Sequence, residues 1–600
     1  MSQARLAKLS LIAATLLLSG GILWLRAVPS NWHASIYRHA PTPLLGLLAL
    51  TAIATIISIL WIGARGDTFT TVAMVAPLVS AVILFYSIPT LLGYRGQIGD
   101  ITVHVSAVST IISQGTIPDT SYLVTYIIAG MISHTAGFSA PEGLNVLAVA
   151  SFVVFALICA AHARRLGFSA IGTILFIPVA AAISPLPASL AYQTVFVFGV
   201  YFLVVITTVE RRQDITRFRY LIIFPVLIIS ITHPLTAINF IGYAAVVAWL
   251  AVVLLRLHRV TWVNHEMART GIPVAAGAGS VWVWIAYGRP RLVGKTGSII
   301  SAAFLNTQRP EVASKATVTN TLFDQFGFSF IDFIWLGIRL YGDKMVLIGT
   351  AGLVLLAAAI LAHQGVTTSL SAYHWVLITL PPLMTIIEFL PNALPGIQFL
   401  RLLRPSVYLT PVVAAGVVTG CWSYLRRVDG WRAVVAIILV SGLITGSVLL
   451  GAANHYDDPE YTLSVNDHRS AAEIAGYQWF FKNKKRSITT RAVWRLPTRV
   501  AGDLLSEQEL RARSEGLMAS PRNARVPPHF GNSSLGNETE NIYVTSGTRD
   551  HVMLLNVLRR TDRLTRQDLA RLQADPTVVQ IYANGNINIS LVNSNQADNK

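Results

Sequence analysis

Long hydrophobic runs alternate with short polar segments over the first 454 residues. A helix needs about 20 mostly apolar residues to cross the hydrocarbon core of a membrane. The segment at 219–233 is the shortest of these runs and ends beside Pro234. The pattern therefore predicts an α-helical polytopic membrane protein. Its thirteen expected transmembrane helices lie near 8–26, 43–63, 69–90, 143–163, 167–187, 190–209, 219–233, 236–256, 271–288, 345–364, 371–390, 405–425 and 431–453.

The distribution of positive charge predicts the orientation of these helices. With the N-terminus in the cytoplasm, the inner segments hold fifteen Lys and Arg residues and the short outer loops hold five. An excess of Lys and Arg in cytoplasmic loops is the usual sign of orientation. We therefore expect a multi-pass protein of the cell membrane, with the loop around Asp100, the loops 289–344 and 391–404, and all residues after 454 outside.

The polar tail predicts a second domain. We divide the chain into a transmembrane domain, 1–454, and an external C-terminal α/β domain, 455–600. Within the tail, residues 468–483 have the pattern of an amphipathic helix. Segments 541–546, 578–582 and 586–592 have the pattern of strands, and Asn584-Gly585 between the last two is a hairpin signal. Three Asn-x-Ser/Thr sequons, at Asn532, Asn537 and Asn588, agree with an external location.

Composition excludes several other classes of protein. Only 12% of the residues are charged and the mean hydropathy is +0.56, whereas soluble proteins carry roughly 25% charged residues. The net charge of +17 gathers beside the hydrophobic runs, so it indicates topology and no nucleic-acid partner. Cys159 and Cys421 both lie in predicted spans, and no disulfide framework is implied. No metal-binding or phosphate-loop motif occurs, so we assign no metal site and no certain cofactor, and a role for a divalent metal is left open.

The stretch from Arg95 to Gly137 holds the candidate catalytic residues. A helix over 100–114 would place Asp100 and His104 on one face, because residues four apart are neighbours. Gly115 and then Pro118 are the expected signals for its end. Asp100 is a candidate general base, although an aspartate at this position is also a common helix N-cap. His104 is a candidate catalytic partner of Asp100, although such a histidine often only hydrogen-bonds a neighbouring group.

Other polar residues lie at the predicted outer ends of spans. Arg401 and Arg404 are three residues apart and share a helical face. Guanidinium groups pair bidentately with phosphate, so these two residues could bind a lipid-linked donor or simply lipid headgroups. Glu388 lies inside an apolar span and is a candidate partner for one of them. His233 and Arg95 are further candidates for lining the site, although a helix-ending turn at His233-Pro234 explains that histidine equally well.

The arrangement resembles a known family. Gly99-Asp100, followed by His104, Gly115-Thr-Ile-Pro118 and Tyr122, is similar to the first catalytic loop of polytopic GT-C glycosyltransferases, particularly archaeal members that use dolichyl-phosphate sugars. The stretch Arg401-Leu-Leu-Arg404-Pro resembles their late external loop, in which a basic residue meets the donor phosphate. The tail lacks the Trp-Trp-Asp motif of oligosaccharyltransferases.

The resemblance implies a membrane glycosyltransferase. It would move a hexose, mannose first, from a dolichyl-phosphate or polyprenyl-phosphate donor to a lipid-linked glycan or a glycoprotein at the cell surface, in protein glycosylation. Asp100 would be the base or a metal ligand, and Arg401 or Arg404 would hold the phosphate. The alternative is a lipid-linked glycan flippase, which would need polar groups near the middle of its spans. Here the charges gather at the outer ends.

The predicted topology can be tested by cysteine labelling. In a chain whose Cys159 and Cys421 are replaced by alanine, Ser520→Cys should react with a membrane-impermeant maleimide in intact cells. Arg212→Cys should react only after the cells are made permeable, because the charge bias places its loop in the cytoplasm. External labelling at both positions, or at neither, would contradict the topology.

Overall fold

The structure is a computed structural model that describes two separate stretches of the chain. Predicted spans beyond residue 151 lie outside the described residues, as do His233, Glu388, Arg401 and Arg404. Apart from isolated residues, the structure describes 3–29, 33, 35–62, 68–97, 100–116, 123–148, 150–151, 468–485, 487–493, 497–505, 541–547 and 572–592.

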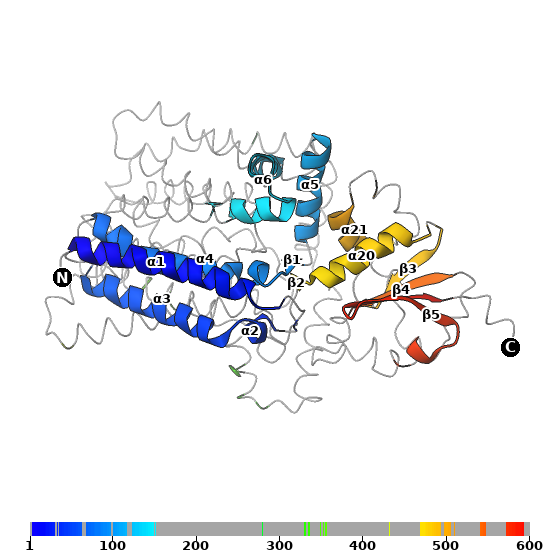
Figure 1. Cartoon of the computed structure of the whole chain (residues 1–600), viewed down its shortest axis with the longest axis horizontal. Coiled ribbons are helices and arrows are strands. Elements are labelled where there is room, and N and C mark those ends of the chain that lie inside the picture. The colour runs from blue at the N-terminus through cyan, green and yellow to red at the C-terminus, as the bar shows by residue number, and fades with distance from the viewer. Residues whose placement is uncertain are drawn as a thin grey trace, which may run out of the picture.

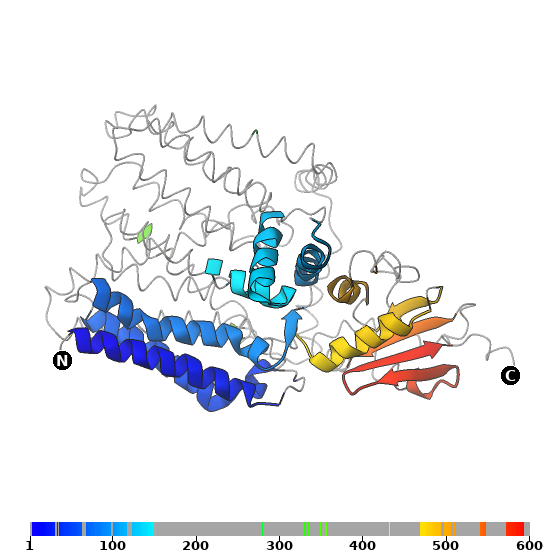
Figure 2. The same cartoon turned by 45° about the horizontal axis from the view of Figure 1, so that its top comes forward.

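Three long helices begin the N-terminal stretch. They are α1 (Gln3–Arg26), α3 (Thr42–Ile62) and α4 (Thr68–Leu91), with α4 packed against both of the others (Figures 1 and 2). The helices predicted at 8–26, 43–63 and 69–90 are thereby confirmed. Among the described residues, Ala4–Arg26 is long and apolar enough to cross a membrane, and the shorter segments Thr42–Thr55 and Ala73–Phe85 are also apolar.

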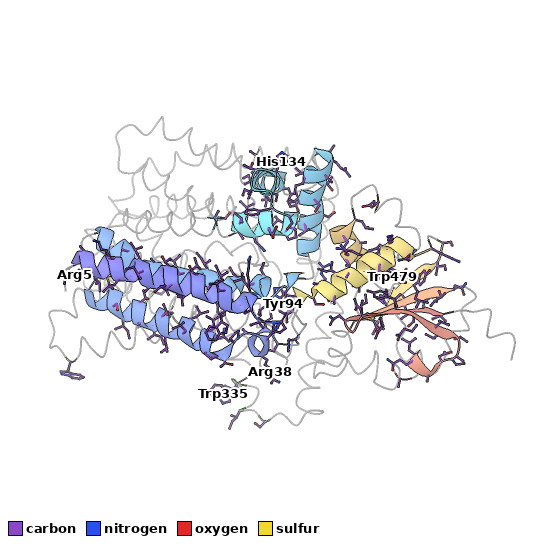
Figure 3. The ribbon with its side chains drawn as sticks, viewed as in Figure 1. Arg5, Arg38, Tyr94, His134, Trp335 and Trp479 are labelled. Carbon is purple, nitrogen blue, oxygen red and sulfur yellow. The ribbon has the colours of Figure 1, made fainter. Side chains whose placement is uncertain are left out.

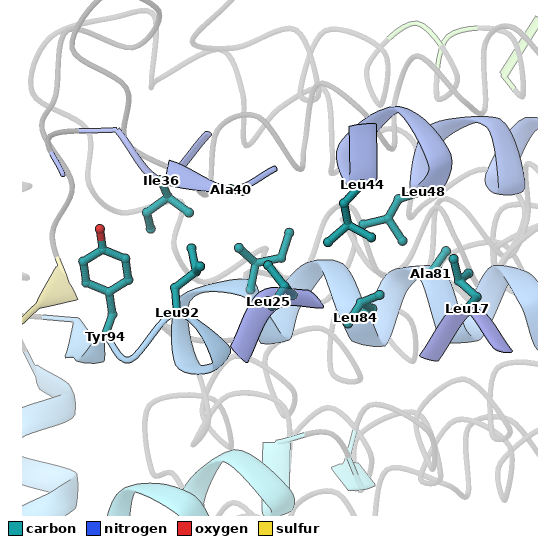
Figure 4. Close-up of a cluster of buried hydrophobic side chains, with 11 residues drawn as sticks. Leu17, Leu25, Ile36, Ala40, Leu44, Leu48, Ala81, Leu84, Leu92 and Tyr94 are labelled. Carbon is teal, nitrogen blue, oxygen red and sulfur yellow. The ribbon is translucent and has the colours of Figure 1, made fainter. Parts of the chain in front are cut away.

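Small residues and leucines hold these helices together. α1 approaches α4 closely at Gly21, where an added Cβ would clash with Leu84. Small residues allow such close approach between membrane helices, where packing rather than the expulsion of water stabilises the contact. Leu25 and Leu84 belong to a buried cluster that reaches Tyr94 at the end of α4 (Figure 4). The short helix α2 (Ile36–His39), capped by Ser35, contributes Ile36 to the same cluster.

The segment after α4 forms a strand and two helices. β1 (Arg95–Gln97) leads to α5 (Asp100–Gln114), and α6 (Leu123–Ala136) follows. The predicted helix over 100–114 is confirmed. Gly115 ends it with a φ of 64°, in the left-handed region that glycine adopts easily, and donates a backbone hydrogen bond to Ile111 O.

The apolar face of α5 packs on α6. Val105 and Val108 of α5, Tyr126 and Ala129 of α6, and Leu144 from the helical residues that follow share one buried cluster. This face fixes how α5 is rotated about its own axis, and therefore where its other residues lie.

The C-terminal stretch is a mixed α/β unit. The sheet order is β3-β4-β6-β5, with β3 parallel to β4 and the other pairs antiparallel. Gly585, with a φ of 80°, lies between β5 and β6, so the predicted hairpin is confirmed. The elements are β2 (His468–Arg469), α20 (Ala471–Asn483), β3 (Thr489–Ala492), α21 (Pro497–Leu504), β4 (Ile542–Gly547), β5 (Val578–Ala583) and β6 (Ile587–Val592).

The helix that opens this unit starts later than predicted. We expected it over 468–483, but it begins at Ala471, after Ser470 accepts a 3.0 Å hydrogen bond from the backbone N–H of Glu473. This cap satisfies an N–H group that the first turn leaves without a helical partner. His468 and Arg469 therefore precede the helix, and they form the strand β2. Gly476 lets α20 lie close to Ile587 of β6, because a side chain there would clash.

The two stretches meet at β1 and β2. These strands pair antiparallel, with Arg95 opposite Arg469 and Gln97 opposite His468. α21 also packs against α5. His468, Arg469 and Glu473 are at most 5% exposed, although they open a polar tail. The C-terminal unit is thus joined to the Asp100 segment through a packed contact.

Burial gives His468 an unusual pKa. Removal of its imidazole from water lowers the pKa from 6.5 to about 4, because burial penalises the charged form. Below pH 6.5 the unfolded chain gains a proton at this residue that the folded chain does not take up until about pH 4. The contribution of this residue to stability therefore decreases as the pH falls.

This shift predicts an acid-sensitive junction. Between pH 7 and pH 4 the free energy of unfolding should fall by roughly 3 kcal/mol through His468 alone. His468→Gln, which cannot be protonated, should show a smaller decrease than the parent chain in denaturation of the full-length protein in detergent. His134→Gln replaces an exposed histidine and is the control. An equal pH dependence in parent and His468→Gln chains would contradict the assignment.

Candidate functional site

The candidate catalytic acid stands at the start of α5. Asp100 is the first residue of that helix and follows the end of β1 by three positions. An acidic residue in the first turn is favourable, because the N-terminal end of a helix carries a partial positive charge. Asp100 is therefore at the helix start as expected, although as the first helical residue it lies one position after the N-cap.

His104 lies one turn further along and is buried. Its exposed fraction is 8%, and its Nδ1 atom lies 2.5 Å from Tyr126 Oη of α6. The two rings are tilted by 50°, with centroids 5.5 Å apart. This hydrogen bond fixes the imidazole against α6. The described contact favours an orienting role for His104 over proton transfer to a substrate.

Tyr126 was not anticipated from the sequence. Its side chain is fully buried between α5 and α6, with an exposed fraction of 0%. It lies 22 positions after His104 and belongs to a different helix, so no periodic pattern links the pair. The available signal was the Tyr126 hydroxyl within the mostly apolar first half of α6, since buried polar groups normally have partners.

Of the other predicted site residues, the structure describes Arg95. Arg95 lies in β1, where its backbone pairs with that of Arg469. His233, Glu388, Arg401 and Arg404 lie outside the described residues, so whether they meet Asp100 stays a prediction. Within the part of the chain that is described, no group of three or more His, Cys, Asp or Glu could hold a metal ion.

Comparison with known proteins gives low-identity structural likenesses. No protein-family model matches the sequence, and no curated protein matches it. The solved structures it resembles include three GT-C glycosyltransferases, the class already suggested by its motifs. ArnT from Cupriavidus metallidurans in the apo state is 10% identical, with 86% of this chain and 98% of that chain covered and a TM-score of 0.43.

Two further solved structures resemble this chain with similarly low sequence identity and TM-scores. The Archaeoglobus fulgidus oligosaccharyltransferase, solved with Zn and sulfate, is 10% identical, with 88% of this chain and 71% of that chain covered and a TM-score of 0.48. The mycobacterial arabinofuranosyltransferase AftD is 15% identical, with 86% of this chain and 41% of that chain covered and a TM-score of 0.46. With TM-scores below 0.5, these likenesses do not by themselves establish a shared fold or a shared reaction.

The contact between His104 and Tyr126 predicts a stability effect. Tyr126→Phe keeps the buried ring but removes the hydroxyl from His104 Nδ1. Loss of one partner of a buried hydrogen bond should lower the free energy of unfolding by about 1–3 kcal/mol in detergent. Tyr543→Phe is the matched control, because among the described residues its hydroxyl accepts a long 3.4 Å hydrogen bond from the backbone N–H of Lys485. Equal losses in the two variants would argue against a special role for the His104 contact.

Proposed function

We propose that this protein is a membrane glycosyltransferase that moves a sugar from a dolichyl-phosphate or polyprenyl-phosphate donor to an external acceptor. The acceptor would be a lipid-linked glycan or a glycoprotein, in protein glycosylation. The observation that carries the proposal is Asp100 at the first residue of α5, in a segment that the charge bias predicts to lie outside the membrane.

The arrangement of the described elements supports this location. Three segments expected outside are the loop around α2, the β1–α5 segment, and the start of the tail at β2. All three lie at one end of the α1, α3 and α4 helices (Figures 1 and 2). Segments on the same side of a membrane should gather in this way. An external enzyme has no access to cytoplasmic nucleotide sugars, which favours a donor carried on lipid.

The chemistry assigns one role to each residue type. The Asp100 carboxylate would take the proton from the acceptor hydroxyl as that oxygen bonds to the anomeric carbon of the sugar. The bond from the anomeric carbon to the phosphate oxygen breaks at the same time, and the polyprenyl phosphate leaves with the electron pair. Arg401 or Arg404 would neutralise the leaving phosphate by bidentate hydrogen bonds. The resemblance to archaeal family members suggests mannose as the first sugar to try.

Asp100→Asn should separate the catalytic role from the capping role. Asparagine has nearly the same shape, and loss of the attraction between an acid and the helix N-terminus costs only about 0.3–1 kcal/mol, so a purely structural residue should tolerate the change. A general base should not, and transfer should fall by about 10²–10⁴-fold. His104→Ala should have a milder effect, since His104 is held by Tyr126 and can only orient or assist.

The readout is the length of the glycan on the lipid carrier, or on its final protein, in cells that carry each variant at matched expression. Asp575→Asn is the matched control, because the described contacts of this residue cap a turn of the tail through Thr577. Full-length glycans in the Asp100→Asn cells would remove the main support for an enzymatic role. That outcome would favour the flippase alternative.

A further inference from the structure

Tyr94 connects segments from three parts of the chain. It follows α4, lies 3% exposed and immediately precedes β1 (Figure 3). Its hydroxyl accepts a 3.0 Å hydrogen bond from the backbone N–H of His33 and lies 2.8 Å from His39 Nδ1. Its ring lies 6.1 Å from that of His468, which belongs to β2. One side chain therefore contacts the α1–α3 connection and the start of the tail.

The direction of the hydrogen bonds can be deduced from the chemistry of the partners. His39 Nε2 lies 2.7 Å from the carbonyl oxygen of Pro29, and a carbonyl can only accept. Nε2 therefore carries the proton, and Nδ1 of the neutral ring is an acceptor. The Tyr94 hydroxyl donates to Nδ1 while it accepts from His33. The O–H bond of Tyr94 therefore points toward His39 Nδ1.

The electrostatic environment keeps His39 in this neutral form. Burial lowers the pKa of its imidazole, the Pro29 carbonyl raises it in part, and nearby His33 lowers it further. The rings of His33 and His39 lie 4.2 Å apart. At neutral pH the acceptor at Nδ1 is therefore available to Tyr94, and the hydroxyl has one preferred position.

Tyr94 also adjoins the strand that leads to the candidate acid. The next residue begins β1, whose backbone pairs with β2, and α5 starts at Asp100, three positions after the end of this strand. β1 therefore has one fixed end at Tyr94 and one side fixed by His468 and Arg469. A shift of Tyr94 would shift both the strand and the first turn of α5.

We propose that Tyr94 is a positioning residue, which holds the Asp100 segment against the α1–α3 connection and the C-terminal unit through its hydroxyl and its ring. The role rests on the proposed function of Asp100 as base. Tyr94 touches no reacting atom. Its hydroxyl keeps β1 in register with β2, so that Asp100 meets the acceptor in a constant position.

The test compares Tyr94→Phe with Tyr582→Phe in the full-length chain. Both changes delete one hydroxyl from a buried or half-buried ring, and that of Tyr582 accepts only from Asn584 Nδ2, at 3.2 Å, among its described contacts. Amide hydrogen exchange of the purified protein should become about tenfold faster over 95–104 in Tyr94→Phe. Exchange in β4 and β6 should stay as in the parent, and Tyr582→Phe should leave 95–104 unchanged.

Transfer is measured in isolated membranes with dolichyl-phosphate mannose as the donor. The turnover of Tyr94→Phe should fall about tenfold, because small displacements of a catalytic group are costly. The KM for the donor should stay within about twofold of the parent value, since the phosphate is bound elsewhere. A residue needed only for folding would instead lower the amount of active protein, and exchange would accelerate throughout the chain.

The two measurements distinguish failure of this inference from failure of the proposed function. Unchanged exchange over 95–104, or unchanged turnover despite faster exchange there, would overturn the role of Tyr94. Full-length glycans in Asp100→Asn cells would instead overturn the role of Asp100 as base. The exchange measurement needs no substrate, so it decides the placement of Tyr94 in either case.

Discussion

The pairing of β1 with β2 is the contact on which the placement of the candidate site depends. β1 is only three residues long and lies between the end of α4 and Asp100. A segment this short has little structure of its own, so its position comes from its neighbours. The buried cluster at Tyr94 fixes one end, and the backbone of His468 and Arg469 fixes the side. The tail thereby becomes part of the scaffold that holds the acid.

The polar residues at this contact carry an energetic cost, because they are buried. Burying a charged or strongly polar group is unfavourable unless well-placed partners compensate for the lost water. His468, Arg469 and Glu473 are nearly fully buried, and His39 and Tyr94 satisfy each other by hydrogen bonds. The His39–Tyr94 pair has one good arrangement, because a small displacement would leave one of these buried groups without its hydrogen bond. The junction should therefore hold the β1–α5 segment in a single position.

Local patterns in the sequence were sufficient to predict the longer helices. The apolar runs predicted α1, α3 and α4, and the spacing of Asp100, His104 and Gly115 predicted α5 with its left-handed end. The β1–β2 pair could not be predicted, because two very short polar strands from distant parts of the chain carry no periodicity. Tyr126 and Tyr94 were missed for the same reason, since their partners are set by packing. The arginines of the proposed phosphate site lie outside the described residues and stay a prediction.

Photocrosslinking from β1 tests most directly whether the tail holds the acid-bearing segment. A photoreactive amino acid at position 97, in the full-length protein in native membranes, should crosslink to the segment around 468–470, with which β1 pairs. The same group at exposed position 573 should not reach that segment. Mapping of the crosslinked peptides by mass spectrometry gives the answer. Crosslinks from position 97 that fall only within residues 1–151 would contradict the account.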